Sequence, residues 1–174
     1  YAGAGYLADW PSPLSAGAAR DARRPATNVS WFAARAYCAW RGKRLPTTDE
    51  WELAARASET RADATGDPAF LARLLELSTR RRADAAVGST FRTIHGVWDL
   101  HGLVWEWTLD FNSLLVSDDS RATSGRDHPL FCAAGVIGAR DPGDYAAYLR
   151  YGVRATLEGR TVQGGLGFRC ATST

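Results

Sequence analysis

Apolar residues recur at helical spacing in the first half of the chain, and the first such run follows a serine that can cap a helix. Ser30 precedes residues 31–41, and its hydroxyl can accept a hydrogen bond from an amide of the first turn. Gly42 follows the run, at the position where helices often end in a left-handed residue. The pattern therefore predicts a short helix over residues 31–41. The positions that share one face at helical spacing are Ala34, Tyr37, Cys38 and Arg41.

Two further segments of the first half carry start signals for helices. Thr47 and Glu50 have the spacing of a capping box, which predicts a second helix that ends at about Arg56. Asp67-Pro68 combines a cap residue with a proline in the first turn, and it predicts a third helix that ends near residues 80–82. The positions expected to face the core are Trp51, Ala54 and Ala55 in the second helix and Phe70, Leu71, Leu74, Leu75 and Ser78 in the third.

From Val87 onward, glycines interrupt short apolar runs and the helical periodicity disappears. Such runs occur at residues 96–99, 102–108 and 164–170. They predict short strands and tight turns rather than a regular sheet. Early helices followed by a half made of strands and loops are typical of the α+β class, and we expect one domain over residues 1–174.

The first 26 residues differ from the rest of the chain. Residues 1–26 carry aromatic residues, prolines, small residues and a mixed-charge run, which is typical of irregular chain on a protein surface. We expect them to form an irregular lead segment and residues 27–174 to form the core. The sequence contains no methionine, so we expect a processed or truncated product, in which a lost signal peptide would leave no trace.

Composition and charge exclude several classes of protein. Apolar residues make up 45% of the chain and no apolar run of about twenty residues occurs, so we expect no membrane span. The net charge is only +2, and the arginines are scattered except at residues 80–82, so we expect no nucleic-acid partner. The three cysteines are too few for a disulfide-rich scaffold, although their odd number permits one bridge and one thiol.

Six short segments of the chain carry a family resemblance. They are residues 29–40 (VSWFAARAYCAW), 42–47 (GKRLPT), 50–52 (EWE), 99–102 (DLHG), 104–107 (VWEW) and 166–171 (LGFRCA). In this order they resemble the motifs of the sulfatase-modifying-factor family, to which the formylglycine-generating enzymes belong. The resemblance implies a variant of the C-type-lectin-like fold, with short helices and irregular short strands. It also implies that the family's first strands precede Tyr1 and are missing here.

The resemblance further implies a disulfide. Family members pair the cysteine of the Ala-Tyr-Cys helix with the one that ends Gly-Phe-Arg-Cys, which joins Cys38 to Cys170 in this chain. The alternative is two buried free thiols. A bridge of this span stabilises a domain by roughly 2 to 5 kcal/mol and indicates an oxidising compartment, so we expect a periplasmic or secreted protein.

The catalytic cysteines of the family are absent. The enzymes of the family oxidise a cysteine of their substrate to formylglycine with two active-site cysteines that hold copper. Counted back from the Gly-Phe-Arg-Cys motif, these two places fall near Ala146 and Tyr151. Neither residue offers the soft thiolate that selects Cu(I). We therefore expect this chain to lack formylglycine-generating activity.

The sequence offers two further candidate metal sites. The first follows from the same resemblance, and the second follows from the remaining cysteine. The family can bind calcium through backbone carbonyls and a glutamate, which places a possible calcium site at Gly102, Val104 and Glu106. A glutamate that only accepts hydrogen bonds from loop amides explains Glu106 equally well. Cys132, with His128 four residues before it, could hold copper or act as a reactive catalytic thiol. A small buried cysteine is the plainer interpretation.

Two classes of function remain open at this point. The first is a binding or assembly factor that holds a protein or peptide partner in a surface groove. Its basis is a resemblance to the accessory proteins encoded beside copper nitrite reductases, which share residues 103–107 and 110–112. The second is a metal-dependent oxidoreductase with a relocated site near Cys132. The scaffold alone does not decide between them, because function depends on the site.

Overall fold

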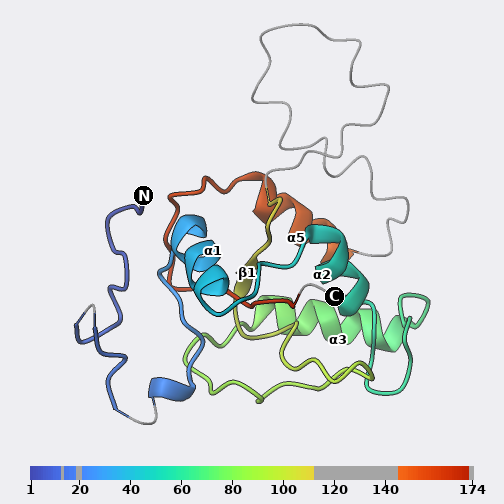
Figure 1. Cartoon of the computed structure of the whole chain (residues 1–174). Coiled ribbons are helices and arrows are strands. Elements are labelled where there is room, and N and C mark those ends of the chain that lie inside the picture. Colours follow the sequence, from blue (N-terminus) through green and yellow to red (C-terminus); the bar gives the residue numbers. More distant parts are fainter. Residues whose placement is uncertain (13, 19–20, 112–144, 173–174) are drawn as a thin grey trace, which may run out of the picture.

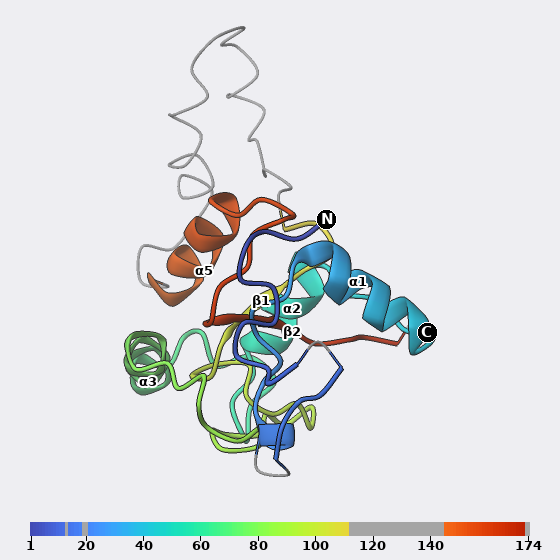
Figure 2. The same cartoon turned by 90° about the vertical axis from the view of Figure 1, so that its left-hand side faces the viewer.

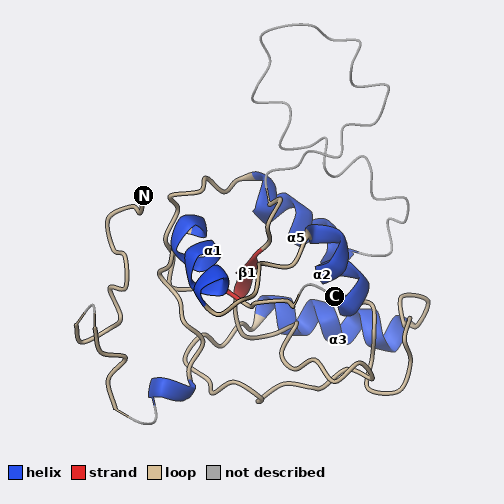
Figure 3. Ribbon diagram, in the orientation of Figure 1, coloured by secondary structure: helices blue, strands red, loops and turns tan. Residues whose placement is uncertain are grey.

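The structure is a computed structural model that describes residues 1–12, 14–18, 21–111 and 145–172 (Figure 1). Short helices and two very short strands are joined by long irregular segments (Figure 3). In chain order the elements are η1 (Asp21–Arg23), α1 (Trp31–Trp40), α2 (Thr48–Ala55), α3 (Pro68–Thr79), β1 (Trp105–Trp107), α5 (Tyr145–Ala155) and β2 (Leu166–Phe168). This small mixed α/β architecture agrees with the predicted α+β class. No described helix is long and apolar enough to cross a membrane.

The three predicted helices begin at the predicted caps. Ser30 accepts a hydrogen bond from the amide of Ala33, and Asp67 accepts from the amides of the first turn of α3. At α2 the capping box is complete, because Thr47 accepts from the amide of Glu50 while the Glu50 carboxylate accepts from the amide of Thr47. Since these bonds join neighbours in sequence, local chemistry fixes where each helix starts.

The buried face of α1 is narrower than its predicted shared face. Ala34 and Cys38 are completely buried, whereas Tyr37 and Arg41 are exposed on the flank of the helix. Gly42 has a φ of 68°, which is the left-handed conformation expected at the end of this helix. Helical spacing therefore identifies the correct face, and the neighbouring elements decide how much of that face is covered.

The two strands form a parallel pair at the centre of the molecule. Trp105 lies opposite Leu166, Glu106 opposite Gly167 and Trp107 opposite Phe168. In two views at right angles, α1 and α5 lie on opposite sides of this pair (Figures 1 and 2). The end of the lead segment passes close to β2, because a Cβ added at Gly167 would meet the carbonyl oxygen of Ala26 at 2.7 Å. Gly167 therefore lets the lead segment and the strand pair pass each other.

The largest apolar cluster fills the space between α1 and the strand pair. Trp107 is completely buried, and its indole N–H donates to the carbonyl of Val29 at 2.9 Å. Trp31 donates to the carbonyl of Thr108 from the other side of the cluster. The buried members are Val29, Ala34, Cys38, Leu45, Trp107, Phe111 and Leu166. Each of these two tryptophans thus adds apolar bulk while its indole N–H is hydrogen-bonded to a backbone carbonyl, as expected for core residues in irregular chain.

The described residues of the lead segment contain the short helix η1 and otherwise no helix or strand, and the segment is attached to the core by backbone hydrogen bonds. Gly3 donates to the carbonyl of Arg160, Leu7 donates to Asn28, and Val87 donates to Arg23. The segment thereby reaches two separate parts of the later chain. These bonds explain how chain without regular structure keeps a defined path.

Candidate functional site

Glu106 is the centre of a buried hydrogen-bond network on β1. Its Oε2 accepts from the indole Nε1 of Trp51 at 2.7 Å and from Nε of Arg169 at 2.5 Å. Its Oε1 accepts from Nη2 of Arg169 at 2.7 Å. The nearby carboxylate and the hydrogen bonds to it raise the pKa of Arg169, against the effect of burial, which is the largest influence and lowers that pKa. Glu106 and Arg169 therefore form a bidentate ion pair.

A second buried carboxylate organises the loop beside this pair. Asp99 has a φ of 58° and accepts hydrogen bonds from the amides of Gly88 and Thr90 and from the Thr90 hydroxyl. Arg169 also donates to the carbonyl oxygen of Trp98 at 3.2 Å. The guanidinium of Arg169 thus links β1 to the loop that contains Asp99.

A surface groove of about 680 Å³ runs past these residues. Apolar side chains of Val87, Val97 and Phe168 line it, together with Trp98, which is half-exposed. Its polar walls include Asp99, Glu106 and Arg169. A concave surface of this size with few polar groups has the composition of a binding site for a small molecule or a peptide segment.

Two residues of the predicted calcium site take part in other bonds, and the third is buried. Both carboxylate oxygens of Glu106 accept hydrogen bonds from Arg169 or Trp51, not from the loop amides of the alternative interpretation. The carbonyl of Gly102 accepts from the amide of Arg82, and Val104 is buried. A calcium ion needs six to eight oxygen ligands, so this arrangement fits a guanidinium better than a calcium ion. Calcium binding here stays a prediction.

On the other side of Trp51 from Glu106, the inner face of α5 carries a second ionic cluster. The carboxylate of Glu52 on α2 accepts from Arg150 at 2.6 Å and from Arg154 at 2.6 Å. All three side chains are almost completely buried. The two arginines lower the pKa of Glu52 and overcome the opposing effect of burial. α2 and α5 are therefore joined by charge rather than by apolar packing.

Arg81 and His101 lie next to this cluster and respond to its charge. The guanidinium of Arg81 stacks on Trp105 at 3.4 Å from the ring centroid. Burial, and then repulsion from Arg150, lower the pKa of Arg81 to about 10. Burial and the same Arg150 lower the pKa of His101 to about 3, although its hydrogen bond to the carbonyl of Ala55 acts in the opposite direction. His101 is thus a neutral core histidine.

The two positions expected for the catalytic cysteines both lie on α5. Ala146 is buried and packs in an apolar cluster with Phe70 and Leu74 of α3. Tyr151 is half-buried, and the guanidinium of Arg154 lies 5.8 Å from the centre of its ring. Neither environment resembles a pair of convergent metal ligands.

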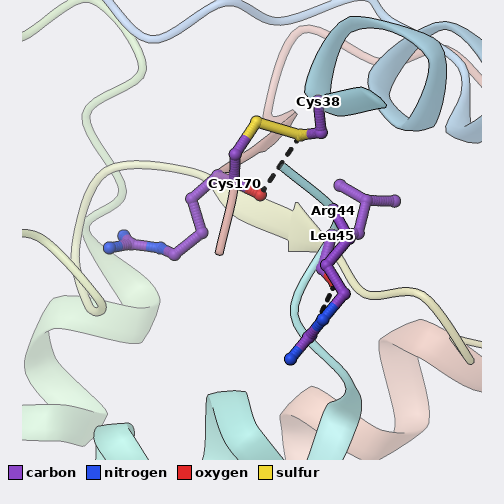
Figure 4. Close-up of a disulfide and its surroundings, with 5 residues drawn as sticks. Cys38, Arg44, Leu45 and Cys170 are labelled. Atoms are coloured by element: carbon purple, nitrogen blue, oxygen red, sulfur yellow. Dashed lines mark hydrogen bonds between the residues drawn. A yellow bond between two sulfur atoms is a disulfide. The ribbon is translucent and has the colours of Figure 1, made fainter. Parts of the chain in front are cut away.

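The cysteines implied by the resemblance form a disulfide. Cys38 on α1 is bonded to Cys170, which follows β2, with their Cα atoms 5.5 Å apart (Figure 4). Arg44 and Leu45 lie beside the bridge in the same view. Backbone hydrogen bonds between Arg44 and Ala171, in both directions, hold the two chain segments together next to it.

The predicted copper site lies outside the described residues, because Cys132 and His128 belong to residues 112–144. Within the described part of the chain, no group of three or more His, Cys, Asp or Glu side chains is placed to hold a metal ion. The structure therefore leaves the catalytic and copper-binding roles of Cys132 as predictions.

Sequence reasoning found Glu106 but missed most of its surroundings. It singled out neither Glu52 nor the arginines of α5, and it predicted no helix at residues 145–155. The sequence signal for α5 was weak, because its buried face carries Arg150 and Arg154 and is therefore polar. The spacing of these arginines, four residues apart, is the one cue that could have indicated a shared carboxylate.

Comparisons with known proteins agree with this geometry. Residues 7–174 match the family described as "Sulfatase-modifying factor enzyme 1-like domain". The formylglycine-generating enzyme of Streptomyces coelicolor is 33% identical over 167 residues, which cover 84% of this chain and 52% of that protein. The inactive C-alpha-formylglycine-generating enzyme 2 of Mus musculus is 32% identical over 181 residues, which cover 94% of this chain and 54% of that protein.

The chain spans about half the length of these two relatives. No solved structure matches it. The family match extends over nearly the whole sequence and includes the helix caps, the strand pair and both disulfide cysteines. The chain belongs to the sulfatase-modifying-factor family of formylglycine-generating enzymes and their relatives.

Proposed function

We propose that this chain is a non-oxidising member of its family that binds a protein or peptide partner in the groove beside Trp98. One observation carries the first part of the proposal: the chain cannot supply two free thiols. Its cysteines number three, and two of them, Cys38 and Cys170, are joined in the disulfide. A Cu(I) centre held by two thiolates of this chain is therefore not available to it.

The environment of α5 supports the same conclusion. The apolar packing around Ala146 leaves a methyl group where the family's chemistry calls for a soft ligand. The Mus musculus relative, whose match covers 94% of this chain, carries the word inactive in its name. We extend that property, for formylglycine generation only, to this chain.

The groove supplies the chemistry for the second part of the proposal. Trp98 and Phe168 offer aromatic surface, and Arg169 and Asp99 offer polar groups already fixed by other bonds. Aromatic anchors on a rigid polar frame are typical of the residues that dominate binding energy in interfaces. A partner peptide would place an apolar side chain against Trp98 and Val97.

The location and the partner class are finer parts of the proposal. The Cys38–Cys170 disulfide favours an oxidising compartment, such as a periplasm or the extracellular space. The resemblance to accessory proteins of copper nitrite reductases favours a role in the assembly of a copper enzyme. We also propose that the fold is a C-type-lectin-like variant, since short helices around a few short strands are compatible with it.

A turnover assay tests the first part. The protein is incubated with Cu(I), oxygen and a cysteine peptide that the Streptomyces coelicolor enzyme converts, and the peptide mass is followed. We expect no aldehyde product where that enzyme gives one. In parallel, thiol titration of the denatured protein should find one thiol before reduction and three after it. Aldehyde formation at a rate near that of the relative contradicts the proposal.

A pair of tryptophan variants tests the groove. Peptides selected from a displayed library for binding to the protein are measured by fluorescence polarisation. Trp98→Ala should weaken binding by about 2 kcal/mol, or roughly thirtyfold, because it removes the aromatic anchor. Trp40→Ala is the matched control, since Trp40 is also exposed but lies on α1, outside the groove. Equal affinity for wild type and Trp98→Ala rejects the groove as the binding site.

The alternative function rests on Cys132, the one cysteine outside the disulfide. A thiol four residues from His128 could hold copper in a metal-dependent oxidoreductase. An anaerobic Cu(I) titration against a competing chelator, with Cys132→Ala alongside, separates the two functions. Tight one-to-one binding that the variant loses favours the oxidoreductase. No binding favours the interaction module.

A further inference from the structure

Two buried guanidinium N–H groups in the described structure have no hydrogen-bond acceptor. They are Nε of Arg81 and Nη1 of Arg150. The Arg150 side chain is only 5% exposed, so bulk solvent does not reach it. Buried polar atoms are nearly always hydrogen-bonded, and charged donors most of all, so two such atoms in one place indicate that something else binds them.

Both arginines line the same small cavity. The cavity holds about 10 Å³, which is close to the smallest space that one water molecule needs, so it has room for a single small occupant. Its remaining walls are mostly apolar or aromatic, and the two charged residues among them are Glu106 and Arg154, each of which is ion-paired with another side chain. The stacking of Arg81 on Trp105 and the bonds of Arg150 to Glu52 fix the two guanidinium groups in position.

The charges around the cavity decide between water and an ion. Glu52 is shared by Arg150 and Arg154, and Glu106 is paired with Arg169. Among the described residues Arg81 forms no ion pair with either carboxylate; Arg150 repels it, and the weaker attraction of Glu106 offsets only part of that repulsion. Among the described residues, four guanidinium groups thus meet three carboxylates in and beside this buried region, those of Glu52, Asp99 and Glu106, which leaves one positive charge in excess. A water molecule would accept the two N–H bonds but leave the positive charge uncompensated, whereas an anion does both.

We propose that this cavity is a binding site for a small monatomic anion, chloride, held between Nε of Arg81 and Nη1 of Arg150. The size of the cavity excludes a larger oxyanion, and its partly apolar walls suit a weakly hydrated ion. The ion joins the segment after α3 to α5, two parts of the chain that are far apart in sequence. The proposal does not depend on the partner-binding function.

The first test is the thermal stability of the protein in sodium chloride and in sodium gluconate at constant ionic strength. We expect a saturable rise of Tm with chloride that gluconate does not produce, because an ion that binds only the folded state stabilises it. Arg81→Gln should lose the chloride response. Arg82→Gln, at an exposed neighbour, is the matched control and should keep it. A response that Arg81→Gln retains, or none in wild type, overturns the proposal.

The second test needs no variant and decides the matter if Arg81→Gln fails to fold. Crystals of the wild-type protein are soaked in bromide, and the anomalous signal is measured. We expect one peak within hydrogen-bond distance of Nε of Arg81 and Nη1 of Arg150. Density for an ordinary water at that position, without anomalous signal, overturns the proposal.

Discussion

The two sides of the β1–β2 pair are held by different forces. On the α1 side, the apolar cluster around Trp107 and the Cys38–Cys170 disulfide connect the helix to the strands. On the α5 side, Glu52 connects α2 to two buried arginines. Apolar packing is non-directional and loses stability in proportion to what is removed. A buried ionic cluster depends on complete pairing, so the loss of one partner leaves the others uncompensated.

The largest expected effect comes from breaking the ionic side. Glu52→Ala leaves Arg150 and Arg154 buried without their carboxylate, and we expect it to lower the free energy of unfolding by roughly 3 to 5 kcal/mol. Urea unfolding followed by tryptophan fluorescence measures the change. Glu59→Ala is the control, because its ion pair with Arg73 is exposed and should contribute less than about 1 kcal/mol. Equal losses in the two variants would remove the contrast between buried and exposed pairs.

Breaking the covalent link on the α1 side should have the next largest effect. The double variant Cys38→Ala/Cys170→Ala opens a link between residues 132 positions apart, and we expect a loss of roughly 2 to 5 kcal/mol. Calorimetry of the variant and wild type gives the value. Cys132→Ala keeps the disulfide and should leave Tm nearly unchanged. A double variant as stable as wild type would mean that apolar packing alone holds α1.

Acid should weaken the ionic side through His101. The pKa of His101 is about 3 in the folded protein and ordinarily 6.5, so the unfolded state binds the proton more readily. Stability is therefore complete above about pH 6.5 and falls as the pH drops below that value. We expect His101 to account for a loss of roughly 2 kcal/mol between pH 7.5 and pH 5.

His101→Gln isolates this contribution. The glutamine side chain cannot titrate, yet it can still donate to the carbonyl of Ala55. Its free energy of unfolding should change less with pH than that of wild type over the same range. Identical pH profiles for the two proteins would show that His101 is accessible to protons in the folded state.

The smallest expected effect comes from a helix cap, a local feature found at the start of both α1 and α2. Thr47→Ala removes one half of the capping box at the start of α2, and we expect it to cost about 1 kcal/mol. Thermal unfolding measures it. Thr47→Ser, which keeps the hydroxyl, should behave almost as wild type. A Thr47→Ala cost near that of Glu52→Ala would mean that the cap supports the ionic cluster as well as the helix.

The outcome of sequence reasoning differed between elements for a physical reason. α1, α2 and α3 were predictable because their caps bond to residues two or three positions away. α5 was missed because two of its core-facing positions are Arg150 and Arg154, so charged residues occupy the face that an apolar stripe normally marks. The short strands were expected, but their parallel register was not, because it joins residues about sixty positions apart.

At the candidate site, too, the sequence predicted some residues but not their distant partners. The sequence singled out Glu106 as a candidate ligand and, through the resemblance, paired Cys38 with Cys170. It assigned Glu106 to calcium or to loop amides, whereas the structure gives it Arg169 and Trp51. Both partners are distant in sequence, and no local pattern marks which carboxylate an arginine will meet.

By itself the sequence determined where the early helices begin, which family the chain belongs to and that residues 145–155 contain no cysteine. These properties depend on residue identity and on neighbours within a few positions. Only the tertiary structure decided that Glu52 meets Arg150 across 98 residues and that Arg81 and Arg150 keep unpaired donors. Burial sets the energy of these charges, and burial exists only once distant segments have packed together.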